Sequence, residues 1–346
     1  MLIQVVRTLE QRKIMSLGRS SLVISLPKYW TQSNELKQGD VVSIAINRDR
    51  SLVIFPSLRK DEGLAKITLH VEPEENITFI IRNIIACYLN GYSYIRLVSK
   101  NFFTVPQQKA IRKIAQMLYL RILEADTKEI HVATLIDESK ASIETGINRI
   151  YKISSSMCRD AFTALKNQDS SLAKSVYAID DEVDHFAYFL LRLVRKATVD
   201  PALANQLALG PIDCLDYQTL VHRIEQVADQ AASIARHLIM VEGRGKKISE
   251  PLLEKMYAAG VDALNFYDRA VNALISSDVK SSIEIIENLA KMEKLDQEIA
   301  SLAFLKEKDT EVICACCSMR DSIMRIAEYA ADIAELTVNR SFKPAS

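Results

Sequence analysis

Residues 224–235 read IEQVADQAASIA, and residues 324–335 read MRIAEYAADIAE. In both stretches small and branched apolar residues recur at steps of three and four, the spacing of one buried helix face. Aligning Val227 with Ile326 relates the stretches by an offset of 99 residues. Caps that start two other helices, Asp169-Ser170 and Ser277-Asp278, lie 109 residues apart. The sequence therefore predicts a duplicated three-helix unit within residues 138–340.

Apolar seams indicate how these helices pack. One seam runs through residues 170–197 and another through 213–242, a pattern typical of long helices packed at shallow angles. Short connections at 167–170 and 276–278 require antiparallel neighbours. We expect an all-α body over residues 138–346, with repeats 138–245 and 246–340. Its six predicted helices are 138–167, 170–197, 213–242, 249–276, 279–305 and 309–339.

Pairs of acids flank both seams. Asp180 and Asp184 lie four residues apart and share one helix face, and so do Glu225 and Asp229. Two such pairs on facing helices would form a cluster of oxygen ligands that suits magnesium, manganese or iron better than copper. The same positions, one residue off the seam, also suit ordinary solvated side chains. Both interpretations stay open at this point.

Other functional groups give weaker signals. Three of the six cysteines cluster as Cys314, Cys316 and Cys317, but the chain lacks the paired spacing of a zinc site, so we interpret them as small residues on a helix face. No nucleophile–base arrangement is evident, so we do not expect an enzyme. No run of about 20 apolar residues is present, and the first twenty residues do not resemble a signal peptide, so we expect a cytoplasmic protein without a membrane span.

The N-terminal 60 residues differ from the rest. They contain ten Lys and Arg against four Asp and Glu, a net +6, which leaves −6 on residues 61–346 because the whole chain is neutral. Residues 12–56 predict a small β-rich domain: a basic opening strand leads into a turn at 18–21, further strands lie at 22–26, 41–46 and 52–55, a helical turn starts at Pro27, and a tight turn lies at Gly39. A basic head on an acidic body indicates a polyanionic partner, although a solvated basic surface explains the charge equally well.

Residues 61–137 predict a third region, a βαβαβ module. Strands are expected at 65–71, 94–98 and 129–134, and helices at 75–89 and 106–123. Both helices should cover one face of a small sheet. Because the module has neither a glycine-rich phosphate loop nor a catalytic cluster, we interpret it as a linker or dimerisation module.

Two families resemble parts of this chain. Residues 12–56 resemble the AbrB/MazE/SpoVT swapped-hairpin DNA-binding domain, through LVISLPKYW at 22–30, through Leu36, Gly39, Asp40 and Val42, and through the closing hairpin. Residues 138–340 resemble PhoU, the phosphate-uptake regulator, through Asp169, the run DDEVD at 180–184, RIEQVAD at 223–229, and RIAE at 325–328. The combination resembles an archaeal-type PhoU-family regulator with a fused DNA-binding head.

The resemblances imply an intertwined N-terminal homodimer and a helical body that binds metal. Transferred by position, the metal motifs fall on Asp180 with Asp184 and on Glu225 with Asp229; the less favoured ligands are Asp181, His222, Glu328 and Asp332. Iron, zinc, manganese or magnesium are the candidate ions. In the second repeat Glu225 aligns with Met324, so we expect one good site in the first repeat and a weak or absent one in the second.

Our first functional hypothesis is a dimeric transcriptional regulator of phosphate metabolism that binds duplex DNA. The side chains expected to contact DNA are Arg7, Arg12, Lys13, Arg19 and Lys28. The alternative is a signalling adaptor that docks a phosphate ABC transporter ATPase or a sensor kinase, with the head serving only for dimerisation. An antitoxin is a third hypothesis, but the long helical body argues against it.

Overall fold

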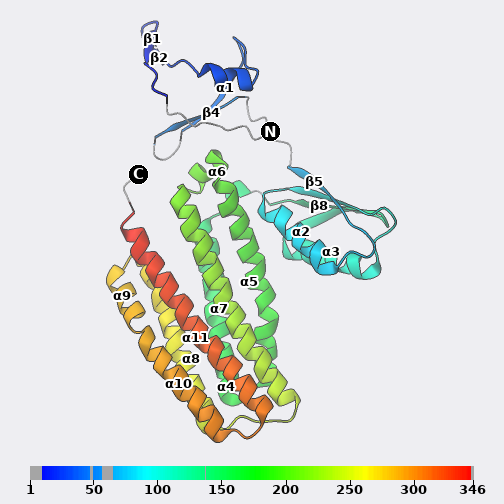
Figure 1. The fold of residues 1–346 in the computed structure, drawn as a ribbon, viewed down its shortest axis with the longest axis vertical. Coiled ribbons are helices and arrows are strands. Elements are labelled where there is room, and N and C mark those ends of the chain that lie inside the picture. The colour runs from blue at the N-terminus through cyan, green and yellow to red at the C-terminus, as the bar shows by residue number, and fades with distance from the viewer. Residues whose placement is uncertain (1–9, 47–49, 57–64, 137, 344–346) are drawn as a thin grey trace. The chain divides into compact units, whose positions relative to one another are not determined.

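The computed structural model describes residues 10–46, 50–56, 65–136 and 138–343 (Figure 1). The chain divides into two compact units, Met1–Gly63 and Leu64–Ser346. The boundary predicted near residue 60 lies outside the described residues.

The first unit contains two small antiparallel sheets and a short helix. Its elements are β1 (Met15–Leu17), β2 (Ser21–Val23), α1 (Lys28–Ser33), β3 (Ser43–Ile46) and β4 (Leu52–Phe55). Strand β1 pairs with β2, and β3 pairs with β4. The turn between β1 and β2 contains Gly18 at φ +70°, and Gly39 has the expected positive φ of +98°. Pro27 is the N-cap of α1 rather than its first helical residue.

The second unit begins with a four-stranded sheet covered by two helices. Its elements are β5 (Lys66–His70), α2 (Ile77–Leu89), β6 (Tyr94–Val98), α3 (Val105–Met117), β7 (Leu120–Ala125) and β8 (Glu129–Thr134). The strand order is β5-β6-β8-β7, with only the β5-β6 pair parallel. Figure 1 shows α2 and α3 on the same side of the sheet, as the sequence predicted. Inward residues such as Leu97 and Val132 are fully buried beneath them.

The structure contains one strand, β7, that the predicted βαβαβ pattern did not include. We expected a helix over 106–123, but α3 ends at Met117 and β7 follows almost at once. Tyr119 takes a left-handed φ of +53°, which ends the helix and turns the chain back toward the sheet. Residues 120–123 are apolar enough for either structure, so their periodicity alone did not distinguish helix from strand.

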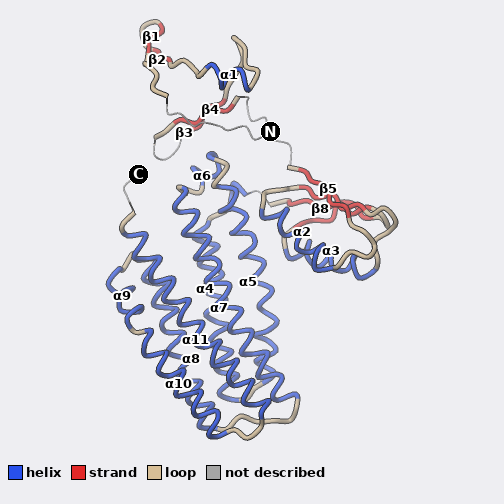
Figure 2. Tube along the Cα trace, viewed as in Figure 1, coloured by secondary structure: helices blue, strands red, loops and turns tan. Residues whose placement is uncertain are grey.

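The body of the second unit is a bundle of long helices (Figure 2). After a short 3₁₀ turn, η1 (Glu138–Lys140), come α4 (Ile143–Asn167), α5 (Ser170–Ala197), α6 (Pro201–Gln206), α7 (Pro211–Gly243), α8 (Glu250–Ser276), α9 (Val279–Glu287), α10 (Leu289–Lys306) and α11 (Thr310–Ser341). Their apolar faces form one continuous core. Among the helices of the described residues, none is long and apolar enough to span a membrane.

The duplication is visible at matching helix boundaries. Helix α4 ends on Gln168 and α8 ends on Ser277, and both residues are left-handed with φ of 48° and 55°. The next residue in each case is an aspartate whose carboxylate accepts hydrogen bonds from the first turn of the following helix. The caps therefore lie where the offset of 109 predicted them.

Two helix predictions need correction. The helix expected over 279–305 is split at Asn288 into α9 and α10, and the side-chain amide of Asn288 donates to the carbonyl of Glu284 at 2.6 Å. Such a side-chain bond competes with the helical backbone ladder. The short helix α6 was not predicted, and the helix predicted from residue 138 begins at Ile143. The described body therefore has the six long helices that were predicted only if α9 and α10 are counted as one helix.

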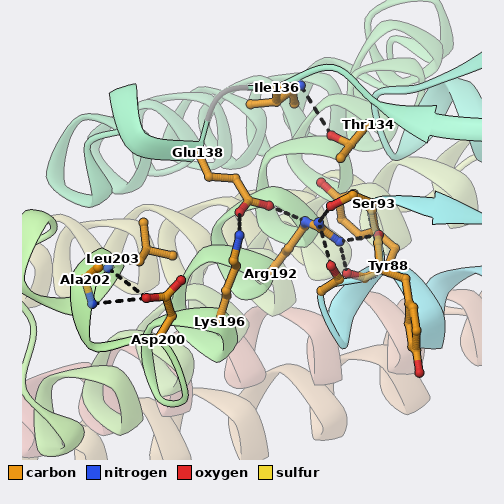
Figure 3. A network of polar contacts seen from close by, with 12 residues as sticks. Tyr88, Ser93, Thr134, Ile136, Glu138, Arg192, Lys196, Asp200, Ala202 and Leu203 are labelled. Carbon is orange, nitrogen blue, oxygen red and sulfur yellow. Dashed lines mark hydrogen bonds and ion pairs between the residues drawn. The ribbon is translucent and has the colours of Figure 1, made fainter. Parts of the chain in front are cut away.

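Arg192 of α5 joins the bundle to the sheet module (Figure 3). Its side chain is 1% exposed, and its guanidinium donates to the carbonyls of Tyr88, Gly91 and Tyr92 near the C-terminus of α2. Helix α2 has no basic residue in its last turn, so α5 supplies the positive charge that its end favours. Glu138 accepts from Arg192 at 2.6 Å and from Lys196 at 2.5 Å, which compensates the buried guanidinium.

We predict that Arg192→Met lowers the free energy of unfolding by about 3–5 kcal/mol, because it removes the hydrogen bonds to the end of α2 and the main partner of buried Glu138. Arg195→Met is the matched control. Arg195 also donates to this end of α2, at the Leu89 carbonyl, but its bonds are exposed, so its loss should lower stability by only about 1 kcal/mol or less. Urea denaturation measures both variants, and equal effects would contradict a special role for Arg192.

Candidate metal centre

The site begins with the packing of α5 against α7. Val183 of α5 and Ile224 and Ala228 of α7 are fully buried in the shared core. The residue after each of them is an acid: Asp184, Glu225 and Asp229. A helix turns about 100° per residue, so these acids emerge at the edge of the seam, where the two helices are still close together.

Three carboxylates meet at this edge. Asp184, Glu225 and Asp229 each offer an oxygen atom, and these atoms lie within 4.8 Å of one another. Asp184 and Glu225 are partly buried, and Asp229 is the most open of the three. Metal–oxygen distances are about 2.0–2.6 Å, so oxygens this close can share one cation. Among the residues that the structure describes, no other group of three His, Cys, Asp or Glu side chains meets this criterion.

The electrostatics of the cluster are unfavourable without a cation. Burial, and then the charge of Asp229, raise the pKa of Asp184 to about 6. Burial and the charges of Asp229 and Asp184 raise the pKa of Glu225 to about 8. Partial desolvation also raises the pKa of Asp229. At neutral pH these groups cannot all be ionised at low energy, so the site favours either protons or a metal ion.

Asp180, the fourth predicted ligand, lies near the cluster but outside the group of three. Burial, and after it the charges of Asp229 and Asp184 in that order, raise the pKa of Asp180 to about 7. It therefore shares the negative field of the site. A cation bound by the other three carboxylates would be close enough to attract it.

The less favoured ligands lie outside the group. Asp181 is exposed and lies 4.0 Å from the ammonium of Lys113 on α3. His222 is exposed. Glu328 is paired with Arg325 at 2.9 Å, and Asp332 is paired with Arg223 at 2.8 Å. Each of the last two acids therefore already has a positive partner.

In the second repeat, the charge of an acid is neutralised by an arginine of the same chain. Asp296 of α10 contacts the guanidinium of Arg320 on α11 at 3.0 Å. Burial raises the pKa of Asp296, and Arg320 opposes that shift. The sequence indicated a missing carboxylate in this repeat, but the role of Arg320 was not predicted. Arg320 lies four residues before Met324 on the same helix face, and that spacing was the available signal.

Tyr188 was also missed. It follows Asp184 by one helical turn, and its ring packs against the core of the sheet module. Burial, and then the charge of Asp184, raise its pKa. Tyr188 thus connects the surroundings of the acids to the module through direct packing.

The predicted DNA contacts lie in the first unit. Arg7 falls outside the described residues. Arg12 is ion-paired with Glu10 and donates to the hydroxyl of Ser25 at 3.4 Å. Lys13, Arg19 and Lys28 are exposed. Arg19 lies in the turn between the paired strands β1 and β2.

Comparisons with known proteins identify the fold of the body. Residues 147–238 match the PhoU domain family. This match covers about a quarter of the chain. The structure resembles PhoU from Pseudomonas aeruginosa, with a TM-score of 0.50 and 18% identity, over 57% of this chain and 93% of that one. It also resembles the phosphate transport system regulatory protein PhoU from Streptococcus pneumoniae, with a TM-score of 0.50 and 14% identity, over 59% and 96%. The chain matches no curated protein sequence.

These findings identify a PhoU domain at residues 147–238 and give the helical body the PhoU fold. The family match includes Asp180, Asp184, Glu225 and Asp229. It does not reach the N-terminal unit, so the AbrB-like interpretation stays a prediction.

The raised pKa values predict how stability depends on pH. Groups whose pKa is higher in the folded state stabilise the fold at low pH and lose that contribution as pH rises through the folded pKa. In chelator-treated protein the cluster should therefore weaken the fold progressively between about pH 4 and pH 8. Asp184→Asn with Asp229→Asn should reduce this loss, although burial still raises the pKa values of Glu225 and Asp180, so the double variant should gain about 1–2 kcal/mol over the parent by pH 8, after allowance for solvent screening. Urea denaturation across this range measures the difference, and a difference independent of pH would show that the acids are not coupled.

Proposed function

We propose that the chain is a dimeric, non-enzymatic regulator of phosphate uptake, in which a PhoU-type body senses or docks and the N-terminal unit binds duplex DNA. The observation that supports the regulatory body is the carboxylate cluster on α5 and α7, which lies inside the matched PhoU domain. The observation that supports the dimer is the lack of a core among the described residues of the N-terminal unit.

No described residue among 10–56 is buried. Ten large apolar side chains are exposed there instead: Ile14, Met15, Leu17, Leu22, Ile24, Tyr29, Val41, Ile44, Ile46 and Leu52. A unit of this size rarely buries enough surface alone, and strands with unpaired apolar faces readily associate. A second copy that interlocks its strands with these would supply the missing core.

The charge of the same unit supports the proposal of DNA binding. Within the described part of the chain, Lys13, Arg19 and Lys28 have no ion-pair partner. Arg12 is held by Glu10, which weakens it as a phosphate ligand. In a dimer the exposed Arg19 side chain in the turn between β1 and β2 would be duplicated by symmetry. Two such cations suit the phosphates of a double helix.

The body would hold a metal ion through Asp184, Glu225 and Asp229, with Asp180 near enough to add its charge. The donor set is oxygen only, which suits magnesium, manganese or iron, with zinc as a further candidate. A bound ion would neutralise the carboxylates and fix the distance between α5 and α7. The chain's own contribution is to hold the acids at the edge of a rigid seam.

A second function is favoured by the extent of the fold likeness. The part of this chain that aligns accounts for more than nine-tenths of each of the two PhoU chains. A helical bundle that aligns with nearly the whole length of a PhoU chain could act as a regulator without binding DNA. The alternative is therefore an adaptor that docks a phosphate transporter ATPase or a sensor kinase. In that case the N-terminal unit serves only for dimerisation.

The metal site has a direct chemical test. Elemental analysis of full-length protein purified without chelator should show a bound divalent or ferric ion. Asp184→Asn with Asp229→Asn should remove it, because two of the three converging carboxylates are neutralised. Glu328→Gln is the control, since Glu328 is paired with Arg325 and should not affect metal content. Equal metal content in parent and double variant would place the ion elsewhere.

DNA binding is tested by titrating duplex DNA with the full chain at several salt concentrations. Lys13→Ala with Arg19→Ala should weaken binding and lower the salt slope by about 0.9 for each phosphate that is no longer neutralised. Arg12→Ala should have a smaller effect because Arg12 is already paired with Glu10. If the full chain does not retain duplex DNA but captures a transporter ATPase subunit or a sensor kinase, the adaptor function is correct instead.

A further inference from the structure

A recess on the surface of the bundle lies between α4 and α5, and none of the acid cluster residues lines it. Its volume is about 450 Å³, and it is lined by Thr145, Asn148, Arg149, Lys152, Ile153 and Glu182. The α4 residues Asn148, Arg149 and Lys152 lie three, four and seven positions after Thr145, so a single face of one helix presents them. All three kinds of donor that bind oxyanions are present on that face: hydroxyl, amide and cation.

The recess contains two cations, Arg149 and Lys152, and one carboxylate, Glu182. Neither Arg149 nor Lys152 forms an ion pair in the described part of the chain. The Arg149 guanidinium carbon lies 4.1 Å from the centre of the Phe186 ring, a cation–π contact that restrains this exposed side chain. Phe186 is itself held by Tyr119 of the sheet module, with ring centres 6.2 Å apart. A guanidinium that is already restrained loses less conformational entropy when it binds an anion.

We propose that this recess binds inorganic phosphate. Arg149 and Lys152 would balance the charge of the ion, and the Thr145 hydroxyl and Asn148 amide would donate to its remaining oxygens. The inference rests on the proposed function, in the form in which the body itself senses phosphate. It adds the place and the residues of that recognition.

Glu182 gives the recess its selectivity. Its carboxylate lines the same space and has no ion pair among the described residues. A carboxylate repels a fully ionised anion, but it accepts a hydrogen bond from one that carries a proton. At neutral pH phosphate retains at least one proton, whereas sulfate has none. The recess should therefore prefer phosphate to sulfate, although the two ions are nearly the same size.

The test is isothermal titration of the full-length, chelator-treated protein with inorganic phosphate and, separately, with sodium sulfate. Chelation is needed because phosphate could otherwise bind a metal ion at the acid cluster. Phosphate should bind in preference to sulfate. Arg149→Gln with Lys152→Gln should weaken phosphate binding by about tenfold or more, since charge-assisted hydrogen bonds are removed. Lys174→Gln, at an exposed α5 position outside the recess lining, is the matched control and should leave binding unchanged.

Glu182→Gln separates selectivity from affinity. Removing the carboxylate charge should strengthen sulfate binding and bring the two affinities together. Asp184→Asn with Asp229→Asn should bind phosphate like the parent, because those acids do not line the recess. Circular dichroism confirms that each variant is folded.

Three results would overturn the proposal: no phosphate binding at millimolar concentration, phosphate binding by the Arg149/Lys152 double variant that is as tight as in the parent, or equally tight binding of sulfate. A phosphoserine peptide that bound more tightly than the free ion would assign the recess to a phosphorylated partner instead. Any of these outcomes, with metal content and DNA or adaptor binding intact, would remove this inference and leave the proposed function standing.

Discussion

Helix α5 is the element on which the second unit depends. One stripe of the helix packs into the core against α4 and α7. The edge of that stripe carries Asp180 and Asp184, and the last turns carry Tyr188 and Arg192 to the sheet module. Because a helix is stiff along its axis, these groups cannot move independently. Helix α5 therefore determines both the position of its acids and the attachment of the sheet module.

One buried charge and one partly buried group of charges involve this helix, and they are compensated in different ways. Arg192 is compensated permanently, by Glu138 and by the carbonyls at the end of α2. The carboxylates near α7 have no such partner among the described residues, and burial together with mutual repulsion raises their pKa values. Burying a charge without a partner is expensive, so the first arrangement rigidifies the fold while the second leaves it short of a positive charge.

The sequence predicted features that depend on residues close together in the chain, and it missed features that depend on residues far apart in the chain. The seams and aspartate caps are local patterns, and they located α4, α5, α7, α8 and α11 within a few residues. The i,i+4 acids were also visible, but their convergence required the register of α5 against α7, which spacing within one helix does not determine. Strand β7 was not predicted because the left-handed turn at Tyr119 has no strong sequence signal. Arg192 and Arg320 were missed because their partners are distant in sequence.

The comparison of the two repeats shows which half of the bundle can respond to its surroundings. In the second repeat Arg320 neutralises Asp296, and an arginine belonging to the chain is always present. In the first repeat the corresponding charge must come from protons or from an ion in solution. An equilibrium shifts only when a ligand binds one state better than the other, and of the two acid sites only that of the first repeat has a charge deficit that an external ligand can fill. The duplication thus kept one packing pattern and left one copy dependent on its surroundings, and that copy contains the helix to which the sheet module is attached.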